Sequence, residues 1–118
     1  MASHNELGKE AEQLAEDWLK EKGYSILHRN WRHSHYEIDI IAAKNNILHI
    51  IEVKARRSSA FGNPEESVTK KKFKNLQKAA DEFLFLNPEF KFIQFSILSI
   101  ILPKNKDPEF FFLEDVFL

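Results

Sequence analysis

The sequence predicts a mixed α/β fold in the order helix, three strands, helix, two strands, with one sheet between the helices. Two segments, residues 5–22 and 69–86, carry apolar residues at helical spacing. Runs rich in Ile, Val and Phe, residue types that favour strands, fill much of the remaining chain. The 118 residues fit a single domain, residues 1–118, large enough to bury about two thirds of its unfolded surface.

The first helix is expected over residues 5–22, because Gly23 is a good residue just past a helix end. Its apolar stripe comprises Leu7, Ala11, Leu14, Ala15, Trp18 and Leu19. Glu12 lies at the edge of this stripe, where a carboxylate is usually only a solvated charge. A first strand is expected over residues 24–31, and the basic stretch after it, which includes Arg32, is expected to form an exposed loop.

Residues 36–57 hold two apolar runs rich in Ile and Val that are joined by an Asn pair. This pattern is typical of a β-hairpin, because Asn tolerates the left-handed backbone that a tight turn needs. With Asn45 and Asn46 as the two turn residues, Lys44 pairs with Ile47. The register of the whole hairpin follows from that pair.

In this register Asp39 falls directly opposite Glu52, and Glu37 faces Lys54. Side chains alternate along a strand, so these four charged residues share one face of the hairpin. The other face is expected to be apolar, with Ile38, Ile40, Ile51 and Val53. The charged face also carries Ile41, Leu48 and Ile50. Strands that are apolar on both faces are central and buried.

Two carboxylates opposite each other do not stabilise a fold, because like charges repel unless one takes up a proton or both share a cation. Mg²⁺ or Mn²⁺ suits two converging carboxylates. Lys54 beside them would orient a water or stabilise developing charge, as in metal-assisted phosphodiester hydrolysis. The alternative is a surface hairpin with charges on its wet face. Charges in a buried strand favour the functional site.

Several segments carry, in order, a resemblance to a known family: GKEAEQLAEDWLKEKGY, ILHRNWR, YEIDII, IIEVKARRSSAFGNPEESV and a closing DVF. Asp39 with Glu52-Val53-Lys54 resembles the first acid and the E-x-K motif of the restriction-endonuclease-like nuclease core. Over residues 7–117 the chain is similar to the small bacterial YraN-like family, which is grouped with the Holliday-junction resolvases. The resemblance implies a restriction-endonuclease-like mixed sheet flanked by helices.

The resemblance also implies roles for two residues outside the hairpin. Glu12 takes the position of an acid in the first helix that reaches the metal site, so Asp39, Glu52 and Glu12 would form the metal-binding set. Lys72 takes the position of a lysine that reaches the site from the second helix.

The second long helix is expected over residues 69–86, after a helical turn that opens at Pro64. Most of its lysines fall on a solvated arc, namely Lys70, Lys71, Lys74 and Lys78. At 100° per residue Lys72 falls inside the apolar arc, where a lone lysine needs an acidic partner or a route to water. Strands over residues 90–101 and 110–118 close the fold, and the Phe-rich start of the last one either buries on both faces or forms a homodimer contact.

The net charge of −1 hides a strong asymmetry. Residues 44–78 hold nine Lys and Arg against three acids, and a local basic patch of this kind binds phosphates. The chain has no cysteine, which fits a reducing cytoplasm and excludes Cys-based catalysis and zinc sites. The polar N-terminus does not resemble a signal peptide, and no apolar run reaches membrane-spanning length. A cytoplasmic protein without a membrane partner is expected.

The first functional hypothesis is a Mg²⁺- or Mn²⁺-dependent nuclease that acts on DNA, in particular branched or damaged DNA. Asp39 and Glu52 would hold the metal, and Lys54 would assist the attacking water. Glu12 and Glu37 would supply outer or second-metal contacts.

Four basic residues are expected to hold DNA phosphates: Arg32, Arg56, Arg57 and Lys72. Arg56 and Arg57 belong to an expected loop of small residues, 55–64, that would bind oxygens of the DNA backbone. Tyr36 offers a ring on which a base can stack.

Two other hypotheses belong to different classes. A non-catalytic nucleic-acid-binding module would keep the nuclease fold without turnover. Three departures from the family pattern, at Ala11, Tyr36 and Ser96, favour that alternative. The intact Asp39, Glu52 and Lys54 favour the enzyme. The third hypothesis is a dimerising adaptor that uses the Phe-rich end of the chain.

Overall fold

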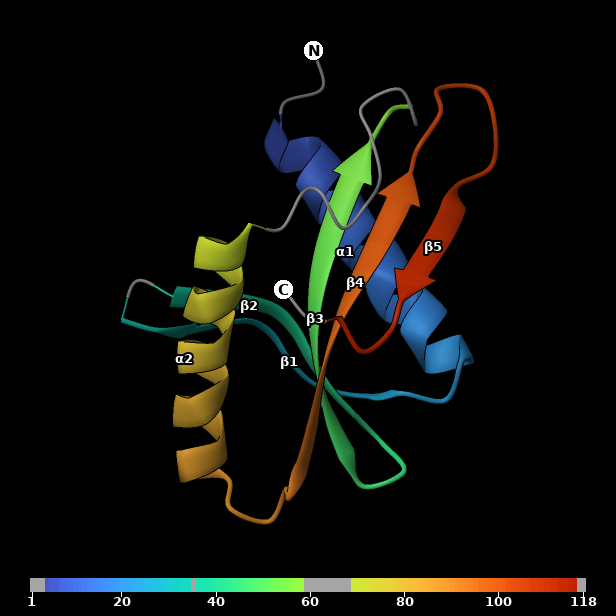
Figure 1. Cartoon of the computed structure of the whole chain (residues 1–118). Coiled ribbons are helices and arrows are strands. Elements are labelled where there is room, and N and C mark those ends of the chain that lie inside the picture. Colours follow the sequence, from blue (N-terminus) through green and yellow to red (C-terminus); the bar gives the residue numbers. More distant parts are fainter. Residues whose placement is uncertain (1–3, 35, 59–68, 117–118) are drawn as a thin grey trace.

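The computed structural model describes residues 4–34, 36–58 and 69–116 (Figure 1). Within these ranges, two helices and five strands follow one another in the order that the sequence predicts. The elements are α1 (His4–Glu21), β1 (Ser25–His33), β2 (Tyr36–Lys44), β3 (Ile47–Arg56), α2 (Lys70–Leu86), β4 (Phe92–Ile101) and β5 (Glu109–Leu113). Neither helix in the described part of the chain is long and apolar enough to span a membrane.

The five described strands form one sheet, in the order β1-β2-β3-β4-β5. Strands β3 and β4 are parallel, because α2 crosses over between them. The other neighbouring pairs are antiparallel. Figure 1 shows α1 against one face of the sheet and α2 against the other. This mixed sheet between two helices confirms the predicted fold class.

A separate apolar cluster lies beneath each helix. The cluster beneath α2 comprises Ile38, Ile41, Leu48, Ile50, Phe73, Leu76, Ala79, Ala80, Phe83 and Ile97. The cluster beneath α1 comprises Ala11, Ala15, Leu19, Tyr24, Ile40, Ala42, Ile51, Leu98, Ile100 and Leu102. Strands β2, β3 and β4 supply residues to both clusters, so they are covered on both faces. This explains why their sequences are apolar almost throughout.

The hairpin turn between β2 and β3 is the one predicted. Asn45 and Asn46 have φ angles of 54° and 65°, which place both residues in the left-handed region. Two such residues in succession match the twist of the flanking strands. Lys44 pairs with Ile47, and the same register continues along the ladder to Ile40 and Ile51.

Strand β1 is longer than expected. Arg32 and His33 were expected in a loop, but they lie in β1 and pair with Glu37 and Tyr36 of β2. Strand β3 likewise runs on to Arg56, so the expected loop of small residues does not begin at residue 55. The helical turn expected at Pro64 lies outside the described residues.

The Phe-rich strand β5 divides its rings between two environments. Phe110 stacks on Trp18 of α1 at a centroid distance of 5.6 Å, and Phe112 meets the same indole edge-on at 5.4 Å. Phe111, between them, is 46% exposed. Alternate side chains of β5 therefore cover α1, as the period of two along a strand requires.

Candidate functional site

The site lies where β2 separates from β3. Backbone pairing of the two strands runs in the predicted register as far as Ile40 and Ile51 and is not continued beyond them. Beyond the last backbone pair, the Asp39 side chain accepts a hydrogen bond in place of the β2 backbone: its Oδ2 accepts from the Val53 N–H at 2.8 Å. The Asp39 carboxylate is therefore fixed at the fork between the two strands.

The alternation of side chains also breaks at Asp39. Ile38 packs beneath α2, whereas Ile40 packs beneath α1, although residues two apart on a regular strand share a face. On β1, Asn30 lies between the residues paired with Ile38 and Ile40 and has a left-handed backbone, with φ of 52°, whereas the register shift of this ladder falls earlier, between Ile26 and His28. The expectation that Ile38 and Ile40 share one apolar face is therefore wrong.

Asp39 and Glu52 form a carboxyl pair at this fork. Glu52 is only 5% exposed, and Asp39 is partly buried. Burial, followed by the charge of Glu52, raises the pKa of Asp39 from 3.8 to about 7, although the hydrogen bond from the Val53 N–H acts in the opposite direction. The two carboxyls thus repel each other, but the β2–β3 ladder ends at Ile40 and Ile51, so the direct pairing of Asp39 with Glu52 stays a prediction.

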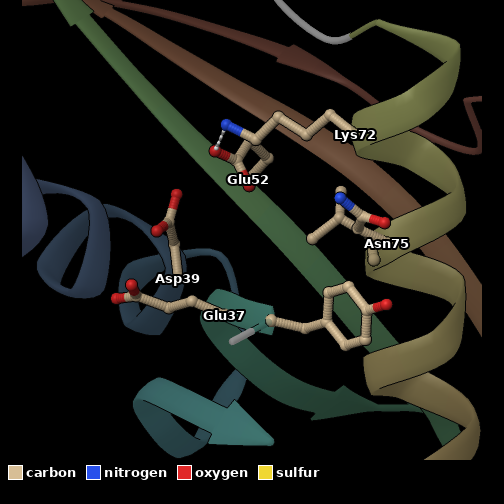
Figure 2. Close-up of a pocket in the computed structure, with 7 residues that line it drawn as sticks. Glu37, Asp39, Glu52, Lys72 and Asn75 are labelled. Atoms are coloured by element: carbon tan, nitrogen blue, oxygen red, sulfur yellow. Dashed lines mark hydrogen bonds and ion pairs between the residues drawn. The ribbon is translucent and has the colours of Figure 1, made fainter. Parts of the chain in front are cut away.

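Two lysines converge on the same oxygen of Glu52. Lys72 reaches across from α2 and donates from Nζ to Glu52 Oε1 at 2.6 Å (Figure 2). Lys54 Nζ lies 3.7 Å from that oxygen. Burial and the neighbouring Lys72 lower the pKa of Lys54. Burial acts to lower the pKa of Lys72, but its hydrogen bonds to Glu52 and Lys54 and the charges of Glu52 and Asp39 together raise it. The predicted inward direction of Lys72 is confirmed.

Asn30 connects two further acids near the fork. With its amide nitrogen facing them, it donates to Glu12 Oε1 of α1 at 3.0 Å and to Glu37 Oε1 of β2 at 3.1 Å. An amide has two N–H donors, so one side chain can hold both carboxylates. Asn30 thereby ties α1 to the start of β2.

Each of these two acids also has an arginine partner. Arg29 NH2 lies 3.4 Å from Glu12 Oε2, and Arg32 NH2 lies 3.3 Å from Glu37 Oε2. The expectation that Glu37 faces Lys54 is wrong, because the β2–β3 ladder ends at Ile40 and Ile51; the cross-strand partner of Glu37 is Arg32 of β1.

A pocket on each face of the sheet reaches Asp39. The larger, about 270 Å³, lies on the α2 side and is lined by Tyr36, Glu37, Asp39, Glu52, Lys72, Asn75 and Leu76. The smaller, about 170 Å³, lies on the α1 side and is lined by Leu7, Gly8, Ala11, Glu12, Asp39, Val53 and Ala55. Asp39 is the residue common to the two, so its carboxyl is approached from both sides of the sheet.

Asp39 and Glu52 are the residues that fit a divalent cation. They are neighbouring carboxylates, the ligand type that Mg²⁺ and Mn²⁺ prefer, and the raised pKa of Asp39 means that a proton or cation would relieve their repulsion. Glu12 does not join them, because in the described ranges no three carboxylate or imidazole side chains are grouped so that they could hold a metal ion. Lys72 already neutralises one oxygen of Glu52.

The other predicted phosphate contacts, Arg32, Arg56 and Arg57, are not among the residues that line these pockets. Arg57 donates to the Leu102 carbonyl at 3.2 Å, and the Arg56 carbonyl accepts from the Leu102 N–H at 2.7 Å. Arg32 has a side chain that is 72% exposed.

Asn30 and Asn75 are site residues that the sequence analysis missed. Asn75 follows Lys72 by three residues on α2, so the helical spacing that placed Lys72 inward could also have placed Asn75 at the pocket. Asn30 gave no such signal, because its role depends on the left-handed backbone opposite Asp39.

Comparison with known proteins identifies the family. The profile of uncharacterised protein family UPF0102 matches residues 11–100. The chain belongs to this family. A UPF0102 protein of Bacteroides thetaiotaomicron is 48% identical over 101 residues, which cover 86% of this chain and 84% of the relative. A second, from Flavobacterium psychrophilum, is 44% identical over 117 residues, covering 99% and 98%. A third, from Syntrophomonas wolfei, is 42% identical over 104 residues, covering 87% and 90%.

UPF0102 is the YraN-like family to which the sequence motifs pointed, so the predicted family relationship is confirmed. The profile match spans the fork, the carboxyl pair and both lysines of the site. Functional roles for these residues come from their geometry.

Proposed function

We propose that this UPF0102 protein is a Mg²⁺- or Mn²⁺-dependent nuclease that hydrolyses DNA phosphodiester bonds. The observation that carries the proposal is the geometry of the fork: the Asp39 carboxyl, held by the Val53 N–H at 2.8 Å, lines the same pocket as the buried Glu52 carboxyl. The pKa of Asp39, which burial and Glu52 raise to about 7, agrees with this arrangement. Strongly perturbed carboxyls in a cleft are characteristic of functional sites. A fold gains nothing from placing two carboxyls together, so a ligand that needs both of them explains the arrangement.

The residues around the pair have separate tasks in this proposal. Asp39 and Glu52 would hold the cation, which when bound would polarise the scissile phosphate and the attacking water. Lys54, 3.7 Å from Glu52 and with a lowered pKa, would orient that water and take part in its deprotonation. Lys72 would hold a phosphate oxygen after its release from Glu52.

DNA as the substrate is supported by charge. Residues 44–78 carry nine basic residues against three acids, and α2 within that segment presents exposed lysines beside the pocket. Basic surface next to an acidic metal-binding cleft is the distribution that a phosphodiester substrate requires. The YraN-like resemblance extends the proposal to branched or damaged DNA.

A cleavage assay tests this function. End-labelled single-stranded, duplex, flapped and four-way DNA would be incubated with the protein in Mn²⁺, Mg²⁺ or EDTA. We expect cleavage of at least one substrate with Mn²⁺, none with EDTA, and loss of cleavage in Asp39→Asn purified in the same way. Lys54→Ala should lose cleavage as well, and Lys104→Ala, which replaces an exposed lysine between β4 and β5, is its matched control. Cleavage by Asp39→Asn at the wild-type rate would reject the proposed site.

A second candidate function is a non-catalytic nucleic-acid-binding module. The observation that favours it is the 2.6 Å bond from Lys72 to Glu52, which supplies a positive charge beside the carboxyl pair without any metal. Binding of DNA in EDTA, with no cleavage of any of the four substrates in Mn²⁺, would support this second function and exclude the first.

A further inference from the structure

The pocket on the α2 side of Asp39 has the dimensions of a site for a single nucleotide. Its volume of about 270 Å³ lies just below the range of about 300–1,000 Å³ found for small-molecule sites. A base pair within a stacked duplex does not fit into such a space. An unpaired nucleotide, from a single strand or extruded from a duplex, does.

The walls of this pocket differ in chemistry. Glu37, Asp39 and Glu52 make one wall acidic, and this is the wall at which a phosphate and its cation would meet the chain. Away from these acids the pocket is lined by Tyr36, Asn75 and Leu76. An aromatic ring, an amide and an aliphatic side chain are the groups that contact a nucleobase.

Tyr36 is a ring held in place before any ligand arrives. It is half-buried and packs against the apolar cluster beneath α2. The Lys78 ammonium lies 5.7 Å from the centroid of the ring, in a cation–π contact. A rigid ring at a pocket wall is a stacking platform with little conformational entropy to lose on binding.

Asn75 supplies a hydrogen-bonding edge. Its side chain is half-buried at the pocket, on the same side of α2 as Lys72 (Figure 2). Within the described residues no hydrogen bond joins its amide to another group. An asparagine amide offers one donor and one acceptor side by side, which matches N7 and N6 of adenine.

Helix α2 also offers a basic path for the nucleic-acid strand that carries this nucleotide. Lys71 and Lys78 are exposed and lie four residues before and three residues after Asn75, so their side chains border it on the same side of α2. Two ammonium groups about two turns apart can contact phosphates on either side of the bound nucleotide.

We propose that the α2-side pocket binds one unpaired nucleotide, with its base stacked on Tyr36 and read by Asn75, adenine being preferred. This rests on the proposed function, because the same pocket presents the carboxyl pair to the phosphate. It adds the substrate class: a single strand or an extruded nucleotide, with Tyr36 and Asn75 as specificity-determining residues.

The test uses short single strands that contain one 2-aminopurine, an isomer of adenine that keeps N7 but has no N6 amine. Its fluorescence falls when it stacks, so this probe reports on Tyr36 and not on the reading of the base by Asn75. Binding would be titrated in EDTA and in Ca²⁺, so that the readout does not depend on cleavage. We expect quenching and saturable binding to the wild-type protein. Tyr36→Leu should lose the quenching and bind about tenfold more weakly, whereas Tyr36→Phe should retain both, since stacking needs only the ring.

Base preference tests Asn75. We expect the wild type to bind an adenine-containing strand about tenfold more tightly than a strand with cytosine in its place, and Asn75→Ala to bind both alike. Gln77→Ala, on the exposed side of α2, is the matched control and should keep the preference. Circular dichroism melts would confirm that each variant is folded.

The outcomes separate this inference from the proposed function. Tyr36-dependent quenching without cleavage in Mn²⁺ would leave the nucleotide pocket in place and remove the nuclease. Metal-dependent cleavage with unaltered quenching in Tyr36→Leu and unaltered preference in Asn75→Ala would overturn the inference and leave the nuclease. Absence of any binding in both EDTA and Ca²⁺ would overturn it as well.

Discussion

Asp39→Asn is expected to make the metal-free protein more stable at pH 8. The pKa of Asp39 in the fold, about 7, is higher than its ordinary value of 3.8, so the folded state binds this proton more tightly than the unfolded state does. The contribution of Asp39 to stability is therefore greatest below pH ~4, and it is lost as the pH rises through ~7. Asparagine stays neutral at every pH.

The size of the effect follows from the two pKa values. A difference of about three between 3.8 and about 7 corresponds to roughly 4 kcal/mol at high pH. Partial exposure of Asp39 and the burial of the new amide reduce this to about 2–3 kcal/mol. For 118 residues 1 kcal/mol shifts the melting temperature by about 4 °C, so we expect a rise of roughly 8–12 °C at pH 8 and almost none at pH 4. The new side chain can still accept from the Val53 N–H.

The assay is thermal unfolding followed by circular dichroism at pH 4, 6 and 8, on protein treated with chelator. Asp81→Asn, an exposed aspartate of α2, is the matched control and should change stability by less than about 0.5 kcal/mol. Mn²⁺ at ten times its dissociation constant should stabilise the wild type by about 1.4 kcal/mol and do little for Asp39→Asn. A wild-type and a mutant melting temperature that differ by the same amount at all three pH values would refute the reasoning about Asp39.

Three further predictions concern the basic residues. Lys72→Ala should lower the melting temperature more than Lys71→Ala, because it leaves the buried Glu52 without its closest counter-ion; equal effects on thermal melts would contradict the role of Lys72. Replacing Arg56 and Arg57 together should reduce the slope of log affinity for DNA against log salt by about two, as measured by fluorescence anisotropy; an unchanged slope would exclude both from phosphate contact. Lys54→Ala should abolish Mn²⁺-dependent cleavage yet keep Mn²⁺ affinity in calorimetry, and wild-type turnover in that variant would remove Lys54 from the chemistry.

Local patterns in the sequence were sufficient for the hairpin turn and for the direction of Lys72. Asn45 and Asn46 adopt the left-handed backbone that the hairpin signal requires, and the register they start is the one observed as far as Ile40 and Ile51. Lys72 lies inside the apolar arc of a regular helix. Both features depend on residues close together in the chain, where a fixed period determines direction.

The details of the fork were decided by tertiary structure. Sequence periodicity continues the hairpin past Asp39, whereas in the fold β2 leaves β3 there and stays with β1. As a result Glu37 pairs with Arg32 instead of Lys54, and Glu12 is held by Arg29 and Asn30 instead of joining the carboxyl pair. A strand that has neighbours on both sides can keep only the pairing that the sheet's twist and local irregularities allow.

The pocket beside the carboxyl pair is likewise a product of long-range packing. Tyr36 and Asn75 are distant in sequence. They line one cavity because α2, which connects the parallel strands β3 and β4 along the chain, packs against β2. Periodicity shows which side of each element faces inward. It does not show which inward side chains meet, because that depends on how far the helix lies along the sheet. The sequence by itself therefore determined the elements, the turn and the acidic and basic residues of the site, and the fold decided which of them come together.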